Sequence, residues 1–162
     1  MLDPYIAQYG RRLYGLCLSL CGTPHAAEDL YQDTWLKALV HFAQYDPARP
    51  FEPWLTGICV NLYRNRLRRL ARSPVFSFAS GEEQERVLQS VPEPEPPDYT
   101  PLYAAVQRLP EKLRVTVILY YFQDMDIARA AAVLRVPQGT VKSRLNKARK
   151  QLKEVLTDAA DL

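Results

Sequence analysis

The sequence contains no long hydrophobic run, because charged residues interrupt the apolar stretches throughout its 162 residues. A membrane-spanning helix needs about 20 consecutive apolar residues, so we expect no membrane insertion. The N-terminal stretch MLDPYIAQYGRRLYG also lacks the basic start and apolar core of a secretory signal. Because nearly half of the residues are hydrophobic, the chain can still bury a core. These features predict a folded, cytoplasmic protein.

Cysteine is scarce, and the three present are Cys17, Cys21 and Cys59. An odd number leaves one thiol without an internal partner, which fits a reducing compartment. Cys17, Cys21 and His25 are spaced four apart, as a metal or redox site could require. Pro24 is expected to restart the helix before His25, however, and cysteine often fills a core as a small hydrophobe. We therefore expect core packing, with no metal and no cofactor, and keep a metal or redox role as the alternative.

The chain also lacks the features of an enzyme site, because it has neither a glycine-rich loop nor a set of metal ligands. Asp29 and Asp33 lie one helical turn apart and are the nearest approach to a pair of acid–base carboxylates. No third polar partner completes such a site. We therefore predict that the protein is not an enzyme.

The net charge of +3 conceals an uneven distribution. Residues 61–75 hold five arginines and no acidic residue, and residues 76–103 hold six acidic residues and one basic residue. Residues 104–162 hold eleven basic and six acidic residues. Two basic segments separated by an acidic one indicate two places where a polyanion could dock.

Apolar residues recur with helical spacing, and no stretch shows the period-two alternation of a strand, so the predicted fold class is all-α. Asp3 and Thr23 are the expected N-caps of the first two helices, each followed by a proline at the first helical position. The pattern predicts helices over residues 3–20, 24–42, 53–72, 127–134 and from 138 onward.

The segment SVPEPEPPDYTP holds five prolines in twelve residues, which excludes a regular helix or strand. We predict a stiff, Pro-rich acidic linker over residues 75–100, within which a short helix over residues 82–89 fits. The linker would join two small helical domains, residues 1–74 and 101–162. A long surface loop inside one domain is the alternative, although such loops are uncommon in compact domains.

The helices over residues 127–134 and from Gln138 are joined by RVP, which is the spacing of a helix-turn-helix. An apolar stripe on the second helix would pack on the domain and consists of Val141, Leu145, Ala148 and Leu152. Gly139 would leave the free amides at the helix start open to a phosphate. The residues left to face outward suit phosphates and base edges and are Thr140, Lys142, Ser143, Arg144, Lys147 and Arg149. A merely solvated charged face is the alternative.

A second polar stripe follows from spacings of three and four residues and consists of Asn61, Arg64, Asn65, Arg68 and Arg72. Asparagine amides suit base edges, and the arginines suit the backbone. Trp54, near Tyr45 and Phe51, could stack on unpaired bases or belong to the core.

A third face, opposite the buried stripe of the second helix, consists of Asp29, Gln32, Asp33 and Leu36. Because this face is acidic with one apolar residue, it suits a protein partner better than DNA.

Three motifs now stand in order: AEDLYQDTWLKAL, PWLTGICVNLYRNRLRR and LPEKLRVTVILYYF…VPQGTVKSRLNKARKQL. Together they resemble an extracytoplasmic-function sigma factor of bacterial RNA polymerase. The resemblance covers both predicted domains. It implies an alternative sigma factor that binds core polymerase and promoter DNA, with an inhibitory anti-sigma protein as a further candidate partner. A stand-alone helix-turn-helix regulator is the alternative, which would bind duplex DNA without polymerase.

The resemblance also implies a role for each surface. The acidic face, with Asp29, Gln32 and Asp33, would bind the clamp helices of the largest polymerase subunit. In the third helix, Asn61 would capture a flipped-out base of the minus-10 element. The last helix would read the minus-35 element. The residues implied to flank Asn61 are Arg64, Asn65 and Arg68, and those implied for the minus-35 element are Thr140, Lys142, Ser143, Arg144 and Lys147.

Overall fold

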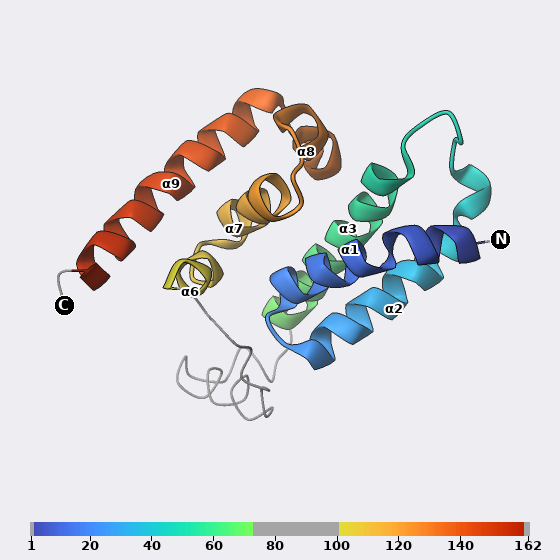
Figure 1. The fold of residues 1–162 in the computed structure, drawn as a ribbon, viewed down its shortest axis with the longest axis horizontal. Coiled ribbons are helices and arrows are strands. Elements are labelled where there is room, and N and C mark those ends of the chain that lie inside the picture. The colour runs from blue at the N-terminus through green and yellow to red at the C-terminus, as the bar shows by residue number, and fades with distance from the viewer. Residues whose placement is uncertain (1, 73–100, 161–162) are drawn as a thin grey trace.

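The computed structural model describes residues 2–72 and 101–160, with side chains described to residue 157. Within these ranges the protein is helical and contains no strand, as predicted (Figure 1). The first region consists of α1 (Asp3–Cys21), α2 (Pro24–Val40), the short η1 (Phe42–Gln44) and α3 (Phe51–Arg72). The second consists of α6 (Pro101–Gln107), α7 (Glu111–Val117), η2 (Ile118–Phe122), α8 (Ile127–Leu134) and α9 (Gln138–Ala160). The predicted linker and the helix over residues 82–89 lie outside the described residues.

Local sequence signals explain how α1 ends and α2 begins. Gly22 has a φ of 81°, in the left-handed region that glycine adopts readily, and its amide donates to the Leu18 carbonyl at 2.8 Å. Thr23 then caps α2 as predicted, because its hydroxyl accepts from the Ala26 amide at 3.4 Å. The predicted N-cap of α1 is wrong by one residue. Leu2 occupies that position, and Asp3 lies in the first turn, where the helix dipole favours a carboxylate.

The core of the first region includes two cysteines. Cys17 of α1 and Cys59 of α3 are completely buried, and their Sγ atoms lie 3.7 Å apart. The contact with Cys59, followed by burial, raises the pKa of the Cys17 thiol, and burial raises the pKa of Cys21 to about 11. Cys17 and Cys21 therefore stay in the thiol form, which is the weaker nucleophile and metal ligand. This favours core packing over a metal or redox role.

The second region contains the helix-turn-helix. The Asp126 carboxylate accepts from the Arg129 amide at 2.7 Å and caps α8. Arg135, with φ 57° and ψ 45°, ends α8 in the left-handed conformation and turns the chain toward α9. The predicted stripe of α9 faces inward: Val141, Leu145 and Ala148 are buried, and Leu152 packs against the core at partial exposure.

The two regions contact each other. α3 packs against α8, and α1 packs against η2, whereas α9 packs against α6, α7 and α8. In Figure 1, α9 therefore runs along the outer side of the second region, and α7 and α8 lie toward α3. Buried apolar side chains of both regions form one connected cluster. None of the described helices is both long and apolar enough to cross a membrane.

Candidate nucleic-acid interface

The outer side of α9 carries the residues predicted to read duplex DNA. Thr140 and Arg144 are half-buried near its start. A Cβ atom added at Gly139 would meet nothing within 4 Å, so the start of α9 is open to a phosphate. Such a face, rich in cations and hydroxyls, can neutralise phosphates and reach base edges. Its exposed members are Gly139, Lys142, Ser143, Lys147 and Arg149.

A groove of about 520 Å³ runs between the start of α9 and α7. The α9 side of the groove includes Ser143, Arg144 and Lys147, and the α7 side includes Lys112. Lys112 is exposed and adds a cation from a second helix to the predicted DNA surface. Sequence reasoning missed it, because helical spacing groups only residues of the same helix.

Arg149 is held by an aromatic neighbour. Its Nε donates to the Tyr121 hydroxyl at 2.7 Å, and its guanidinium carbon lies 5.6 Å from the centre of that ring. Its Nη1 also donates to Asn146 Oδ1 at 3.2 Å. The side chain of Arg149 remains exposed, so it presents a positioned cation further along the helix.

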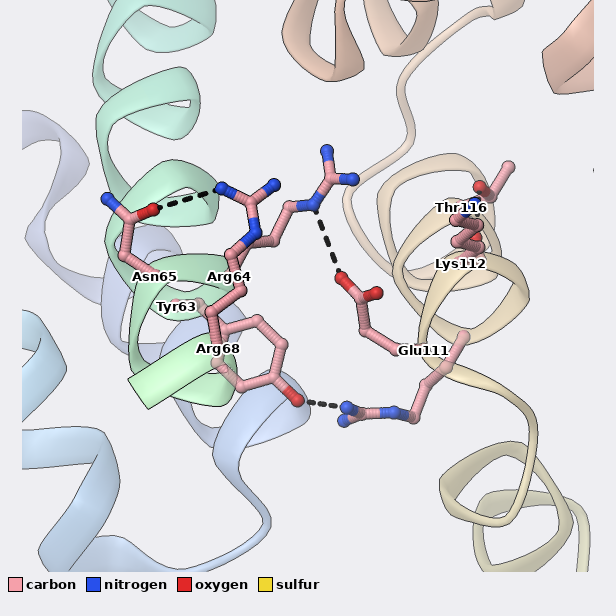
Figure 2. Close-up of polar contacts among 8 residues, drawn as sticks. Tyr63, Arg64, Asn65, Arg68, Glu111, Lys112 and Thr116 are labelled. Atoms are coloured by element: carbon pink, nitrogen blue, oxygen red, sulfur yellow. Dashed lines mark hydrogen bonds and ion pairs between the residues drawn. The ribbon is translucent and has the colours of Figure 1, made fainter. Parts of the chain in front are cut away.

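The predicted stripe on α3 is divided. Arg64 Nε lies 3.3 Å from Glu111 Oε1 of α7, with the two side chains 22% and 33% exposed. Asn61 is also half-buried. Asn65 and Arg68 are exposed, and Arg68 Nη1 donates to Asn65 Oδ1 at 3.4 Å (Figure 2). The part of the stripe near Asn61 and Arg64 therefore meets the second region, and the part near Asn65 and Arg68 is open to solvent.

Trp54 belongs to an aromatic cluster at the start of α3. Its ring centre lies 5.0 Å from that of Tyr45 and 5.5 Å from that of Phe51. The side chain is half-buried rather than completely enclosed. Trp54 and Asn61 line the same cavity of about 500 Å³. The structure thus brings together the aromatic ring and the amide that the sequence suggested for an unpaired base.

The predicted acidic face of α2 is exposed at Asp29, Gln32 and Leu36. Asp33 forms an ion pair with Arg66 of α3, and this arginine partly neutralises the charge of the Asp33 carboxylate. Asp29 forms no side-chain hydrogen bond or ion pair with the residues that the structure describes. Beyond Leu36, which is 61% exposed, the face continues into Leu39 and Val40 at 53% and 75% exposure. These two residues were not predicted, and with Leu36 they form an apolar strip.

Two known protein families match consecutive segments of the chain. Residues 5–73 match Sigma-70 region 2, and residues 99–152 match Sigma-70 region 4. The two matches together cover most of the chain and follow the order of the two helical regions.

Individual relatives match along most of this chain. The ECF RNA polymerase sigma factor SigE of Mycolicibacterium smegmatis is 33% identical over 159 residues, which cover 95% of this chain and 61% of that protein. SigW of Bacillus subtilis is 28% identical over 162 residues, with 93% and 86% covered. EcfG of Rhodopseudomonas palustris is 30% identical over 144 residues, with 89% and 78% covered. The chain therefore spans less than two thirds of SigE but most of SigW and EcfG.

Solved structures share the fold. The sigma factor RpoE of Bartonella quintana, in complex with the anti-sigma factor NepR, superposes with a TM-score of 0.73 at 24% identity, covering 97% of this chain and 98% of that one. CnrH, in complex with the cytosolic domain of CnrY, gives a TM-score of 0.68 at 25% identity, covering 96% and 86%. With both sigma regions matched in order, the chain belongs to the extracytoplasmic-function family of RNA polymerase sigma factors.

Proposed function

We propose that the protein is an alternative sigma factor that binds core RNA polymerase through α2 and directs it to promoters through α3 and α9. Residues 1–74 act as region 2, residues 101–162 as region 4, and residues 75–100 as the linker. The observation that carries this proposal is the separation of charge on one chain. The exposed face of α2 is acidic and apolar, whereas the exposed faces of α3 and α9 are basic.

The polymerase surface is assigned to Asp29, Gln32, Asp33 and Leu36 of α2. Exposed carboxylates attract a basic partner, and an adjoining apolar strip supplies contact area. Leu39 and Val40, which are both exposed, extend this strip along α2. The clamp helices of the largest polymerase subunit are the proposed partner.

The two DNA surfaces are assigned to different helices. Asn61, supported by Trp54, captures an unpaired base of the minus-10 element, and the arginines of α3 contact the backbone nearby. Arg144 reads a base edge of the minus-35 element from the start of α9. The other proposed minus-10 residues are Arg64, Asn65 and Arg68, and the other proposed minus-35 residues are Gly139, Thr140, Lys142, Ser143, Lys147 and Arg149.

An inhibitory anti-sigma protein is a further proposed partner. The solved structures of RpoE and CnrH are both complexes, RpoE with an anti-sigma factor and CnrH with the cytosolic domain of CnrY. The similarity of fold over nearly the whole chain supports a partner of this class. Co-purification of the tagged protein from its own cells would identify it.

The polymerase assignment is tested with Asp29→Arg, because this carboxylate has no ion-pair partner to disturb among the described residues. We expect at least tenfold weaker binding to core polymerase, since reversal replaces attraction by repulsion. Glu28→Arg is the matched control, because it makes the same charge change at the neighbouring exposed position of α2. Binding is measured by fluorescence titration, and circular dichroism verifies the fold.

Run-off transcription with core polymerase on genomic fragments tests the function itself. The wild-type protein should start transcription at discrete sites, and the Asp29→Arg variant should lose this activity. Binding to core that is equal for Asp29→Arg and Glu28→Arg would remove the α2 assignment. Tight binding to duplex DNA without polymerase, and no transcription with it, would identify a stand-alone regulator instead.

A further inference from the structure

The helix α9 has two edges, one on each side of its buried stripe. A helix turns through about 100° per residue, so Arg144 and Arg149, which are five positions apart, lie about 140° apart around the helix axis. The buried residues Val141, Leu145 and Ala148 lie in the arc between them. Arg144 and Arg149 therefore mark opposite edges of the face that α9 presents to solvent.

The start of α7 borders the edge that Arg144 marks. Lys112 of α7 lines the groove of about 520 Å³ together with Arg144 and Lys147 of α9. Lys112 is exposed, and its side chain forms no hydrogen bond or ion pair with the described residues. The neighbouring carboxylate of Glu111 is paired with Arg64, so it does not neutralise Lys112. This edge therefore carries a further cation that is available to an anion.

The turn that follows α7 borders the edge that Arg149 marks. Tyr121 belongs to η2, a π-helical turn in which the Gln123 amide donates to the Ile118 carbonyl at 3.0 Å. Wide turns of this kind often occur at functional sites. The Tyr121 hydroxyl accepts from Arg149 Nε, and Asn146 Oδ1 accepts from Arg149 Nη1. Arg149 Nη2 donates to none of the described residues, so the guanidinium can bind a phosphate while it keeps both contacts.

One continuous segment thus reaches both edges of α9. α7 and η2 are consecutive, and α7 packs against α9. The major groove of B-DNA is about 12 Å wide, and a helix with its side chains is about 10–12 Å across. A helix seated in the groove therefore fills it, and its two edges face the backbones of opposite strands. Lys112 and Arg149 lie at opposite edges, so they would meet different strands.

We propose that α7 and η2 place a phosphate contact at each edge of α9. Lys112 binds a backbone phosphate of one strand of the minus-35 element, and Arg149, with Tyr121 as its positioning residue, binds a phosphate of the other strand. Contacts to both backbones fix the register and orientation of α9 in the groove. The inference rests on the proposed function of α9, and it adds Lys112, Tyr121 and the strand that each cation binds.

The test uses holoenzyme assembled from the full chain and core polymerase. Its probe is a fluorescein-labelled duplex with the minus-35 sequence of a promoter mapped by run-off transcription. In a set of such duplexes, one phosphate at a time is replaced by an uncharged methylphosphonate, first in one strand and then in the other. Anisotropy titration measures the loss of affinity that each replacement causes, and so identifies the phosphates that the wild-type holoenzyme contacts.

Lys112→Ala should weaken binding to the unmodified duplex about three- to fivefold and reduce the salt dependence by about one unit. Without the lysine, neutralising its phosphate should cause no further loss, whereas replacements in the other strand should keep their effect. Arg149→Ala should give the reverse pattern. Circular dichroism verifies the fold of each variant.

Two control variants accompany Lys112→Ala. Lys112→Arg keeps the positive charge and should retain the wild-type pattern of methylphosphonate effects. Arg108→Ala removes one exposed cation of the same region, and Arg108 lines neither the groove beside Arg144 nor the cavity beside Arg149. It should leave the affinity and the pattern unchanged.

Tyr121→Phe tests the positioning of Arg149, because it removes the hydroxyl and keeps the ring. It should weaken binding about twofold, since one hydrogen bond to the guanidinium is lost. It should also reduce the methylphosphonate effects only in the strand that Arg149 contacts. Combined with Arg149→Ala, it should cause no further loss, whereas a general effect on folding would persist in the double variant.

Loss of methylphosphonate effects in the same strand for Lys112→Ala and Arg149→Ala would overturn the proposal. An unchanged pattern in either variant would do the same, as would a Tyr121→Phe effect that persists without Arg149. The proposed function is judged by transcription with wild-type protein. The methylphosphonate pattern requires only bound duplex, and it can be measured without polymerase if the free chain binds DNA. The two can therefore fail independently.

Discussion

The two basic helices α3 and α9 have similar charge patterns but different surroundings. Lys142, Ser143 and Lys147 of α9 are exposed on the outer side of the second region. On α3, Arg64 is paired with Glu111, and Asn61 lies half-buried beside α8. An arginine-rich stripe therefore indicates the capacity to bind DNA, whereas the packing of another element decides whether the stripe is accessible.

The inner sides of the two helices also differ. α9 packs within its own region, on α6, α7 and α8, so its DNA face has the same neighbours whether the regions are together or apart. α3 packs on α1 and α2 inside its region and on α8 across the interface. We therefore expect a change in the packing between the two regions to alter the surroundings of the DNA face of α3 and not those of the DNA face of α9.

The largest expected effect tests whether the regions are energetically separate. Leu16 of α1 and Leu145 of α9 are each 1% exposed, and truncation of such a residue to alanine lowers the free energy of unfolding by about 2–5 kcal/mol. We expect Leu16→Ala to weaken amide protection mainly in the first region and Leu145→Ala mainly in the second. Native-state hydrogen exchange measures both. Equal losses in both regions would show one cooperative unit.

A smaller effect is expected on the accessible helix. Arg144→Ala should weaken holoenzyme binding by about 1–3 kcal/mol and relax the preference at one minus-35 position, because a base-edge contact is lost. The measurement is the affinity for a panel of duplexes with single-base changes in the minus-35 element.

Arg149→Ala serves as the internal reference for that panel. Its guanidinium is held by Tyr121 and Asn146 further along α9, so we expect it to contact phosphate. Its loss should weaken every duplex by a similar factor and reduce the salt dependence by about one unit. The same uniform pattern for Arg144→Ala would mean that Arg144 is also a phosphate contact.

The smallest expected effect concerns the covered helix. Asn61→Ala should reduce transcription from an ordinary duplex about five- to tenfold, since one amide contact to the captured base is lost. Transcription from a template that is already melted at the minus-10 element should fall less if Asn61 acts in strand opening. Run-off transcription on the two templates makes the comparison. An equal reduction on both would assign Asn61 to packing or backbone contact.

Much of the fold could be predicted because its signals are local. Thr23 was predicted as a cap from its residue type and the proline that follows it, and its hydroxyl accepts the expected amide hydrogen bond. The buried stripe of α9 followed from helical spacing. The Asp3 cap was misassigned because Asp is favourable both at the N-cap and in the first turn, and these positions differ by one residue.

The candidate sites were predicted only as far as single helices allow. Spacing along one helix identified Asn61 and Arg64 as neighbours, but it contained no information on Glu111, which lies far along the chain. Lys112 was missed for the same reason. Leu39 and Val40 could have been found, since apolar residues continue the face begun by Leu36 beyond its acidic part.

By itself, the sequence determined that the protein is all-helical, that it carries a helix-turn-helix, and that one acidic and two basic faces exist. These properties depend on caps, helical periodicity and charge, which act over a few residues. Only the tertiary structure decided that Arg114 joins α1 to α3 and that α8 shares a cavity with Asn61. Such contacts join residues that are far apart in sequence, so their geometry depends on how whole helices pack.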